Sequence, residues 1–302
     1  IISNNSTIQP GVSSGIYLED SGSSVSLTAV NLCGNTSDGI ATTANQTYPP
    51  YPNSQVEVDT DTFVVDTCVD AIIVSQDGQG EFTNIQDAID YAPPGGTVRI
   101  LAGTYPGGWT TRTRPITIEG SIGVDGLPTT IIDGGGTAGP VIQVVEHGAS
   151  QLTIKNLDIR NGSTKKGGAG MSVTDASPTI VNCTFRENNT ENAGGGISFI
   201  DSSGTLAGCR FIENAASPGG AVYVSGTSNV TSTGCEFLEN TGGSGGGAIY
   251  VANGGSLDCN SSKFVSNSVL AQFQGGAILI AAGASADLAG NFLCGNTPDQ
   301  IS

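Results

Sequence analysis

Apolar residues recur with a nearly constant period along residues 156–302. Five segments carry the repeat: NLDIRNG (156–162), NCTFREN (182–188), GCRFIEN (208–214), GCEFLEN (234–240) and SSKFVSN (261–267). Their central apolar residues, Ile159, Phe185, Phe211, Phe237 and Phe264, are 26, 26, 26 and 27 residues apart. Glycine-rich segments such as GGGISFI and GGGAIYV lie between them. Two short alternating strands per period cannot bury an apolar face alone, so successive periods must stack.

Stacking of these periods predicts vertical columns of side chains. Stacked strands form parallel, in-register sheets with about 4.8 Å between strands, so residues one period apart become neighbours. Three inward columns follow: Met171, Ile197, Val222, Ile249 and Ile278; Val173, Phe199, Val224, Val251 and Ile280; and Leu157, Cys183, Cys209 and Cys235. The outward positions between the first two columns are Ser172, Ser198, Tyr223, Tyr250 and Leu279. One turn collects Asn188, Asn214, Asn240 and Asn267, whose amides are expected to hydrogen-bond along the stack.

The charged residues follow the same register. One outward column contains Asp158, Thr184, Arg210, Glu236 and Lys263. Its last three members predict a ladder of alternating charge across successive rungs. The whole pattern predicts an all-β protein, a right-handed parallel β-helix or solenoid.

A single short helix is expected before the repeats. Within GQGEFTNIQDAIDYAPPGGTVRILAGTY (78–105), apolar residues follow helical spacing near residues 83–92. Thr83 and Gln86 form a Thr-x-x-Gln capping box, and a Pro-Pro-Gly-Gly run ends the helix. A helix with one apolar stripe is suited to cover the open end of a solenoid.

These motifs resemble those of known families. The stretch 78–105, with the PITIEGS and TIIDGGG segments that follow it, resembles the entry of pectin-lyase-fold proteins. The paired Gly-Gly-Ala-Ile/Val and Phe-x-x-Asn repeats resemble the polymorphic outer-membrane-protein family of adhesins and related proteins of environmental bacteria. The resemblance covers roughly residues 72–302 and implies a β-helix with an adhesive role. The carboxy-terminal membrane barrel of those adhesins has no counterpart in the sequence given.

A second, longer repeat relates the two ends of the sequence. The segment SGIYLEDSGSSVSLTAVNLCGNTSDGI (14–40) matches GAILIAAGASADLAGNFLCGNTPDQI (276–301), with Cys33 and Cys294 separated by 261 residues. We therefore predict that residues 1–40 form partial β-helix rungs that duplicate the C-terminal end. Residues 41–70 read as a Pro-containing linker, and residues 71–302 as the β-helix with its capping helix.

Three arrangements of the duplicated rungs stay open. The sequence is a window cut from a tandem array, or a subunit whose N-terminal rung adds to the C-terminal end of a neighbour, or a chain whose N-terminal rung packs on its own solenoid. In the first two arrangements, the expected partner is another copy of the same unit. An uncapped stack presents a row of unpaired backbone donors and acceptors, to which a further strand can add. The first residue is Ile and no basic-then-apolar leader follows, so a mature or windowed product is expected.

Seven cysteines are present. Cys33 and Cys68 bracket the linker, and we predict a disulfide between them. We interpret Cys183, Cys209 and Cys235 as small core residues rather than stacked disulfides. Cys259 lies out of their register and is not assigned, and the pairing of Cys294 also stays open.

Composition and charge restrict the partners. Charged residues make up only 12% of the chain and the formal net charge is −17, which argues against nucleic acid because phosphate binding requires clustered Lys and Arg. No run of eighteen apolar residues could span a membrane. The acidic surface serves solubility, or its acid-rich loops bind Ca²⁺, with Glu57, Asp59 and Asp61 as the candidate ligands. No other cofactor is expected.

Two further surface features were identified from the sequence. Nine Asn-x-Ser/Thr sequons are candidate N-glycosylation sites in a eukaryotic secretory route: Asn4, Asn5, Asn35, Asn45, Asn161, Asn182, Asn188, Asn229 and Asn260. Tyr17, Tyr223 and Tyr250 are candidates to contact sugar rings or a partner subunit, or are ordinary exposed aromatics.

No convincing catalytic constellation emerges. Candidate acids are Asp125, Asp133, Asp158 and Asp175, with Lys155, Arg160 and Arg186 nearby by register. The lone His147 cannot form a triad or a metal site by itself, so we expect a surface turn residue. The favoured interpretation is a secreted structural or adhesive β-helix at the cell surface, a repeating unit of a filament or fibre that contacts copies of itself and candidate carbohydrate or cell-surface partners. The alternative is a pectin-lyase-type polysaccharide lyase or hydrolase.

Overall fold

The computed structural model describes residues 71–302 except 113, 136–138, 146–150, 271–274 and 299, and describes eight short strands between residues 1 and 70 by their backbones. Two compact units are present. The first contains Ile1–Ala71 and Tyr91–Gly96, and the second contains Ile72–Asp90 and Thr97–Ser302.

The first unit contains three small sheets, β1-β4-β8, β2-β5-β6 and β3-β7. All of its strand pairs are parallel except β5 with β6. The strand bounds are β1 Ile2–Ser3, β2 Ser6–Thr7, β3 Ser24–Leu27, β4 Asn31–Cys33, β5 Thr36–Ser37, β6 Ile40–Ala41, β7 Gln55–Val58 and β8 Phe63–Val65. Parallel pairing of sequentially distant strands is the pairing expected of stacked rungs.

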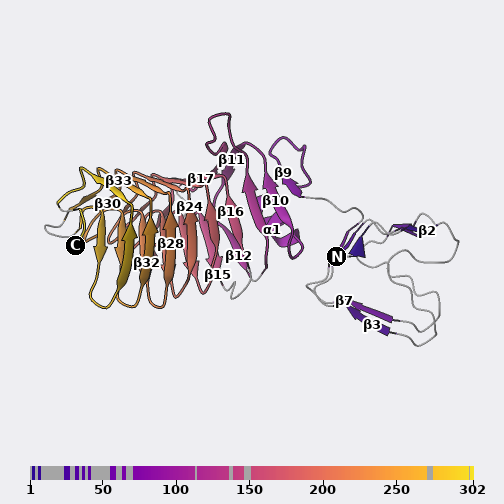
Figure 1. Cartoon of the computed structure of the whole chain (residues 1–302). Coiled ribbons are helices and arrows are strands. Elements are labelled where there is room, and N and C mark those ends of the chain that lie inside the picture. Colours follow the sequence, from indigo (N-terminus) through magenta and orange to yellow (C-terminus); the bar gives the residue numbers. More distant parts are fainter. Residues whose placement is uncertain are drawn as a thin grey trace. The chain divides into compact units, whose positions relative to one another are not determined.

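The second unit is a rod of stacked rungs (Figure 1). Every pair of named strands in it is parallel, and neighbouring strands in each sheet come from successive rungs. The longest sheet has nine strands: β9 Ile72–Val74, β10 Thr97–Ile100, β13 Thr117–Gly120, β16 Thr153–Lys155, β20 Thr179–Val181, β24 Gly204–Ala207, β28 Asn229–Thr233, β32 Ser256–Asn260 and β36 Ser285–Ala289. The predicted all-β parallel β-helix is confirmed.

Three more sheets form the other walls of the rod. The eight-stranded sheet contains β11 Gly103–Pro106, β14 Thr130–Asp133, β17 Leu157–Arg160, β21 Thr184–Arg186, β25 Arg210–Ile212, β29 Glu236–Leu238, β33 Lys263–Val265 and β37 Phe292–Cys294. The seven-stranded sheet contains β12 Trp109–Arg112, β15 Ile142–Val145, β19 Met171–Thr174, β23 Ile197–Ile200, β27 Val222–Ser225, β31 Ile249–Val251 and β35 Ile278–Ile280. The five-stranded sheet contains β18 Ser163–Thr164, β22 Asn189–Thr190, β26 Ala215–Ala216, β30 Thr241–Gly242 and β34 Ser268–Val269.

A file of stacked phenyl rings runs through the interior. Phe185, Phe211, Phe237 and Phe264 are directly paired along the eight-stranded sheet, and each is 0% exposed. Successive ring centroids are 5.1, 4.9 and 4.6 Å apart, with the rings within 7° of parallel. The two inward columns that begin at Met171 and Val173 are also confirmed residue by residue. The 26-residue period therefore determines which side chains meet in the core.

A second interior file is polar and is made of the repeated asparagines. Asn214 donates from Nδ2 to the carbonyl of Phe185 and to Oδ1 of Asn240, while its own Oδ1 accepts from the backbone N–H and the Nδ2 of Asn188. The same pattern continues to Asn267 and then to Asn296. Every member is almost completely buried, so each amide satisfies backbone groups that water cannot reach.

The capping helix α1 spans Ile85–Tyr91 and lies at the end of the rod beside β9 and β10 (Figure 1). It buries Ile85, Ala88 and Ile89, as the apolar spacing predicted. The predicted capping box is wrong, because Asn84 caps the helix in place of Thr83. The Asn84 side chain accepts from the backbone N–H groups of residues 86 and 87, at 2.7 and 3.3 Å. Asparagine is as good a cap as threonine, and its one-residue shift frees Gln86 for another contact.

Candidate functional site

The candidate functional site is the terminal rung of the rod, formed by β35, β36 and β37. Each of these strands is the last of its sheet. Gln300–Ser302 pair with β35, where the backbone N–H of Ile280 donates to the carbonyl of Ser302 at 2.9 Å. Among the strands that the structure describes, none pairs with the outer edges of β36 and β37. These two edges form the open edge of the rod.

The core is also uncovered at the open edge. One rung below the edge, Cys259 and Phe264 are both 0% exposed. Leu288 stacks on Cys259 and Leu293 stacks on Phe264, and both leucines are only half-buried. Phe292 is 58% exposed. An edge that combines unpaired backbone groups with an uncovered apolar interior favours the addition of another strand.

Several charged side chains on the walls of the rod form ion pairs. Asp158 is 8% exposed and accepts from Nε and a terminal nitrogen of Arg186, at 3.0 and 2.9 Å, and Arg186 also contacts Glu187 at 2.9 Å. The predicted ladder is confirmed, since Glu236 lies 3.1 Å from Arg210 and 3.9 Å from Lys263. These exposed or half-exposed pairs fix the register more than they stabilise the rod.

The other candidate acids are held similarly. Asp133 accepts from Arg160 at 2.9 Å and from Asn161 at 3.1 Å. Partial burial opposes ionisation of Asp133, but these hydrogen bonds outweigh it and hold the pKa of that carboxyl below its ordinary value. Asp125 accepts a backbone bond within its own turn, and Asp175 is exposed in a left-handed turn with φ of 51°. In the part of the chain that the structure describes, no three His, Cys, Asp or Glu side chains gather as metal ligands would.

The tyrosine column is confirmed for Tyr223 and Tyr250, and their contact with sugar rings or a partner subunit stays a prediction. The rings of Tyr223 and Tyr250 stack on one another, with centroids 5.8 Å apart and planes 20° apart, so each ring covers one face of the other. The ring of Tyr250 also lies over Gly245, where a Cβ atom would come within 3.2 Å of it. A sugar ring can stack only on a ring face that these contacts leave free.

The outward position below Tyr223 is covered. Ser198 pairs with Tyr223 in register but is only 1% exposed, and its hydroxyl has no hydrogen-bond partner. The turn at Gly194 lies against the backbone of this strand, since a Cβ atom there would be 3.0 Å from the Ser198 nitrogen. Alternation correctly predicted the direction of Ser198 but could not show that a glycine turn folds back over the strand.

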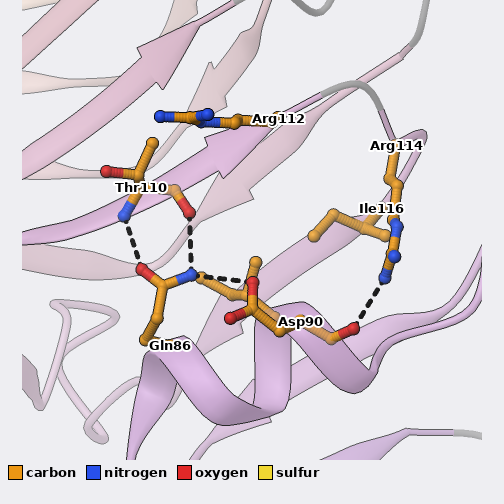
Figure 2. Close-up of a pocket in the computed structure, with 7 residues that line it drawn as sticks. Gln86, Asp90, Thr110, Arg112, Arg114 and Ile116 are labelled. Atoms are coloured by element: carbon orange, nitrogen blue, oxygen red, sulfur yellow. Dashed lines mark hydrogen bonds between the residues drawn. The ribbon is translucent and has the colours of Figure 1, made fainter.

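A groove lies at the opposite end of the rod, between α1 and β12 (Figure 2). The Gln86 side chain accepts from the backbone N–H of Thr110 at 2.8 Å and donates to the backbone carbonyl of Thr110 at 3.1 Å. It also donates to the Asp90 carboxylate at 2.9 Å. Arg114 donates to the carbonyl of Asp90 at 2.7 Å, and the exposed Arg112 also lines the groove. The sequence pattern did not indicate this arrangement, because Gln86 also fits the last position of a Thr-x-x-Gln capping box. The bonds attach the helix to the first rungs.

Five of the sequons lie in described residues. The prediction of Asn188 as a glycosylation site is wrong for the folded rung. Asn188 is fully buried in the asparagine file and its side-chain nitrogen already donates two hydrogen bonds, so a glycan has no access to it. Asn161, Asn182 and Asn260 are half-buried and donate to neighbouring side chains, whereas Asn229 is exposed. Asn229 is thus the most accessible of the five.

Several predicted features fall outside the described residues. Side chains are not described for Glu57 and Cys33, and Asp59, Asp61 and Cys68 are not described at all, so the candidate Ca²⁺ loop and the Cys33–Cys68 disulfide stay predictions. The same holds for Tyr17, His147 and the sequons at Asn4, Asn5, Asn35 and Asn45.

The cysteines divide into buried and exposed thiols. Cys183, Cys209, Cys235 and Cys259 are free and buried, which confirms the first three as core residues, and Cys294 is free and exposed at the open edge. Cys259 lies in the nine-stranded sheet opposite Ser232, which explains why it does not fit the register of the other three. Burial raises the pKa of the Cys183 thiol to about 12 and that of the Cys259 thiol to about 11.

We predict that iodoacetamide at pH 8 modifies Cys294 about 100-fold faster than any of the four buried thiols, because alkylation requires an accessible thiolate. Peptide mass spectrometry of the native chain measures the rate at each position and reports Cys33 and Cys68 in the same experiment. A denatured sample, in which all free thiols react, is the control. Rapid modification of Cys183 in the native chain would contradict the closed interior.

Comparison with known proteins identifies the fold. The family profile described as "Right handed beta helix region" matches residues 132–293. A pectin methylesterase mutant in complex with a hexasaccharide is similar at a TM-score of 0.37 and 12% identity, over 68% of this chain and 81% of that chain. ORF18 of Geobacillus virus E2 is similar at a TM-score of 0.38 and 13% identity, over 77% of this chain and 59% of that chain.

No curated protein matches the chain. Among the helices that the structure describes, none is long and apolar enough to cross a membrane. The profile match includes more than half of the 302 residues. The chain therefore belongs to the right-handed β-helix family.

Proposed function

We propose that this protein is an extracellular structural or adhesive rod, a repeating unit that continues end to end into a fibre. The observation that carries the proposal is the open edge. Beneath it the core is closed at 0% exposure, and at the edge Leu288 and Leu293 are half-buried while β36 and β37 present unpaired backbone groups. An uncovered apolar interior beside a free strand edge favours the addition of another strand.

Three further features support a structural role at the cell surface. The Gly-Gly-Ala and Phe-x-x-Asn repeats resemble those of surface adhesins. The asparagine and phenylalanine files join each rung to the next, so the fold resists extension along its axis. Asp133 and Asp158, two of the four candidate catalytic acids, are paired with arginine. Carbohydrate or cell-surface ligands, and glycans at exposed sequons such as Asn229, are additional proposals of the same kind.

The proposal predicts that the chain associates through the open edge. Leu293→Asp places a charge on the apolar position that stacks on Phe264, so it should weaken association at least about tenfold without unfolding the rod. Thr205→Asp adds the same charge to an exposed wall position and should leave association unchanged. Sedimentation velocity over a range of concentrations measures both variants against the parent chain.

Two results would count against the proposal. The first is a parent chain that stays monomeric at every concentration, and the second is association that Leu293→Asp leaves intact. Turnover of polyuronates by the purified chain in the presence of Ca²⁺ would redirect the assignment to the polysaccharide lyase or hydrolase class.

A further inference from the structure

The rod's terminal rung has a copy near the start of the sequence. Ser285–Ala289 and Phe292–Cys294 form β36 and β37, and residues offset by 261 from these form β3 and β4. Leu27 corresponds to Leu288 and Cys33 to Cys294, both by that offset. The direction of pairing also agrees, since β4 pairs in parallel with β1 as β37 pairs in parallel with β33.

The copy has one rung more than the original. β3 pairs in parallel with β7, and β4 pairs in parallel with β8. The equivalent strands β36 and β37 have no such neighbour among the described strands. The described strands thus show the same rung twice, once with β7 and β8 added to it and once with a free edge.

The offset of 261 assigns a register to the missing rung. In the copy, Leu27 is opposite Val58 and Leu32 is opposite Val64. By the offset, Leu27 and Leu32 correspond to Leu288 and Leu293, so Val58 of an added rung comes opposite Leu288 and Val64 opposite Leu293. The apolar residues of the extra rung thus lie opposite the two half-buried core residues of the open edge.

We propose that the open edge binds a second copy of this protein's own segment 42–66, whose β7 and β8 add in parallel to β36 and β37. This inference rests on the proposed function and specifies its contact. In an array of such units, the segment between two rods is then the closing rung of the rod before it, and not a passive linker. Main-chain hydrogen bonds supply the affinity, and the valines at alternate positions select the register.

Charge opposes this contact at one position and so provides a way to test the register. Asp287 is stacked on Asp258, and Ser26, the equivalent of Asp287, is opposite Glu57. The bound segment therefore places Glu57 next to Asp287 in an outward column of three carboxylates. Like charges directly opposite one another weaken strand pairing.

The first test is a site-directed cross-link. Cys33 is opposite Val65, so Val65 of the bound segment falls opposite Cys294. In-register strands place such Cα atoms about 4.8 Å apart, within the range that a disulfide spans. A synthetic 42–66 peptide carrying Val65→Cys, oxidised with the full 302-residue chain, should form a disulfide with Cys294 about tenfold faster than a peptide carrying Val64→Cys, because adjacent strand residues point to opposite faces.

Peptide mass spectrometry identifies the partner thiol. A disulfide to Cys294 with the Val65→Cys peptide supports the proposal. Equal rates for the two peptides, or a disulfide mainly to Cys33, would overturn it, because either result means that the segment does not occupy the open edge in the stated register. Appending residues 42–66 after Ser302 should abolish the cross-link, because the edge is then filled within the chain.

The second test is a charge cycle measured by fluorescence anisotropy of the labelled peptide. Asp287→Lys in the chain, or Glu57→Lys in the peptide, should each tighten binding about two- to fivefold, and the two changes together should lose most of that gain because lysine then faces lysine. Asp201→Lys, at an exposed position away from the open edge, is the matched control. Gains that simply add would overturn the register.

The proposal and the broader function can fail separately. If the chain assembles end to end but the peptide neither binds nor cross-links to Cys294, the inference is wrong and the proposed function survives. If the peptide binds in the stated register while the chain stays monomeric, the contact is right and fibre formation by this chain is wrong.

Discussion

Asn214→Ala is expected to lower the free energy of unfolding by about 3–6 kcal/mol. The substitution removes the donor to the Phe185 carbonyl and the acceptor of two N–H groups of Asn188, all of which are buried. Each buried polar group left without a partner costs about 1–3 kcal/mol. Guanidinium unfolding followed by circular dichroism measures the change, and hydrogen exchange locates it at the rungs on either side.

Asn189→Ala is the matched control. Asn189 is adjacent in sequence, but its side chain is exposed and no hydrogen bond of that side chain is seen in the described structure. The expected change is within about 0.5 kcal/mol. Equal stability of the two variants would mean that the asparagine file does not hold the rungs together.

Phe211→Ala is expected to cost about 3–5 kcal/mol, the range for truncating a buried phenyl ring. The ring stacks against Phe185 at 5.1 Å and Phe237 at 4.9 Å, so its removal leaves a cavity between two rings that successive backbones hold in place. Gly196 lies against the same ring, since a Cβ atom there would be 3.0 Å from it. Thermal unfolding of Phe211→Ala and Phe211→Leu separates two contributions to the lost stability, the cavity and the loss of ring stacking.

The leucine variant fills most of the volume and should cost less than about 1.5 kcal/mol. If both variants lose the same stability, the loss of ring stacking rather than the loss of side-chain volume accounts for the destabilisation. If neither loses stability, the interior is not packed as described.

The period of the sequence predicted most of the rod because stacking gives every residue a neighbour at a fixed offset. Once Phe185, Phe211 and Phe237 are aligned, the pairing of every strand between them follows, and the structure confirms it. The charge ladder through Glu236 was predictable for the same reason.

Features that depend on turns were not predictable from the period. The cap at Asn84 instead of Thr83, the glycine turn over Ser198 and the attachment of Gln86 to Thr110 each depend on how a loop returns to the strand. The sequon at Asn188 illustrates the same limit, because the turn that carries it points the amide into the core. A three-residue motif contains no information about that direction.

The sequence predicted that the rung at the open edge has a copy, but it did not predict that this rung is uncovered. The match of residues 14–40 to 276–301 indicated that the same rung occurs twice. Only the strand pairing shows that β3 and β4 carry an additional rung, and only the exposure of Leu293 shows that the core is uncovered where this rung is missing.

Electron microscopy of the native material is the most direct test of an end-to-end rod. The account predicts unbranched fibres in which rods follow one another along their long axes, with the open edge of each rod covered at the joint. Isolated rods of one unit's length at all concentrations, or rods that associate side by side through their walls, would contradict it.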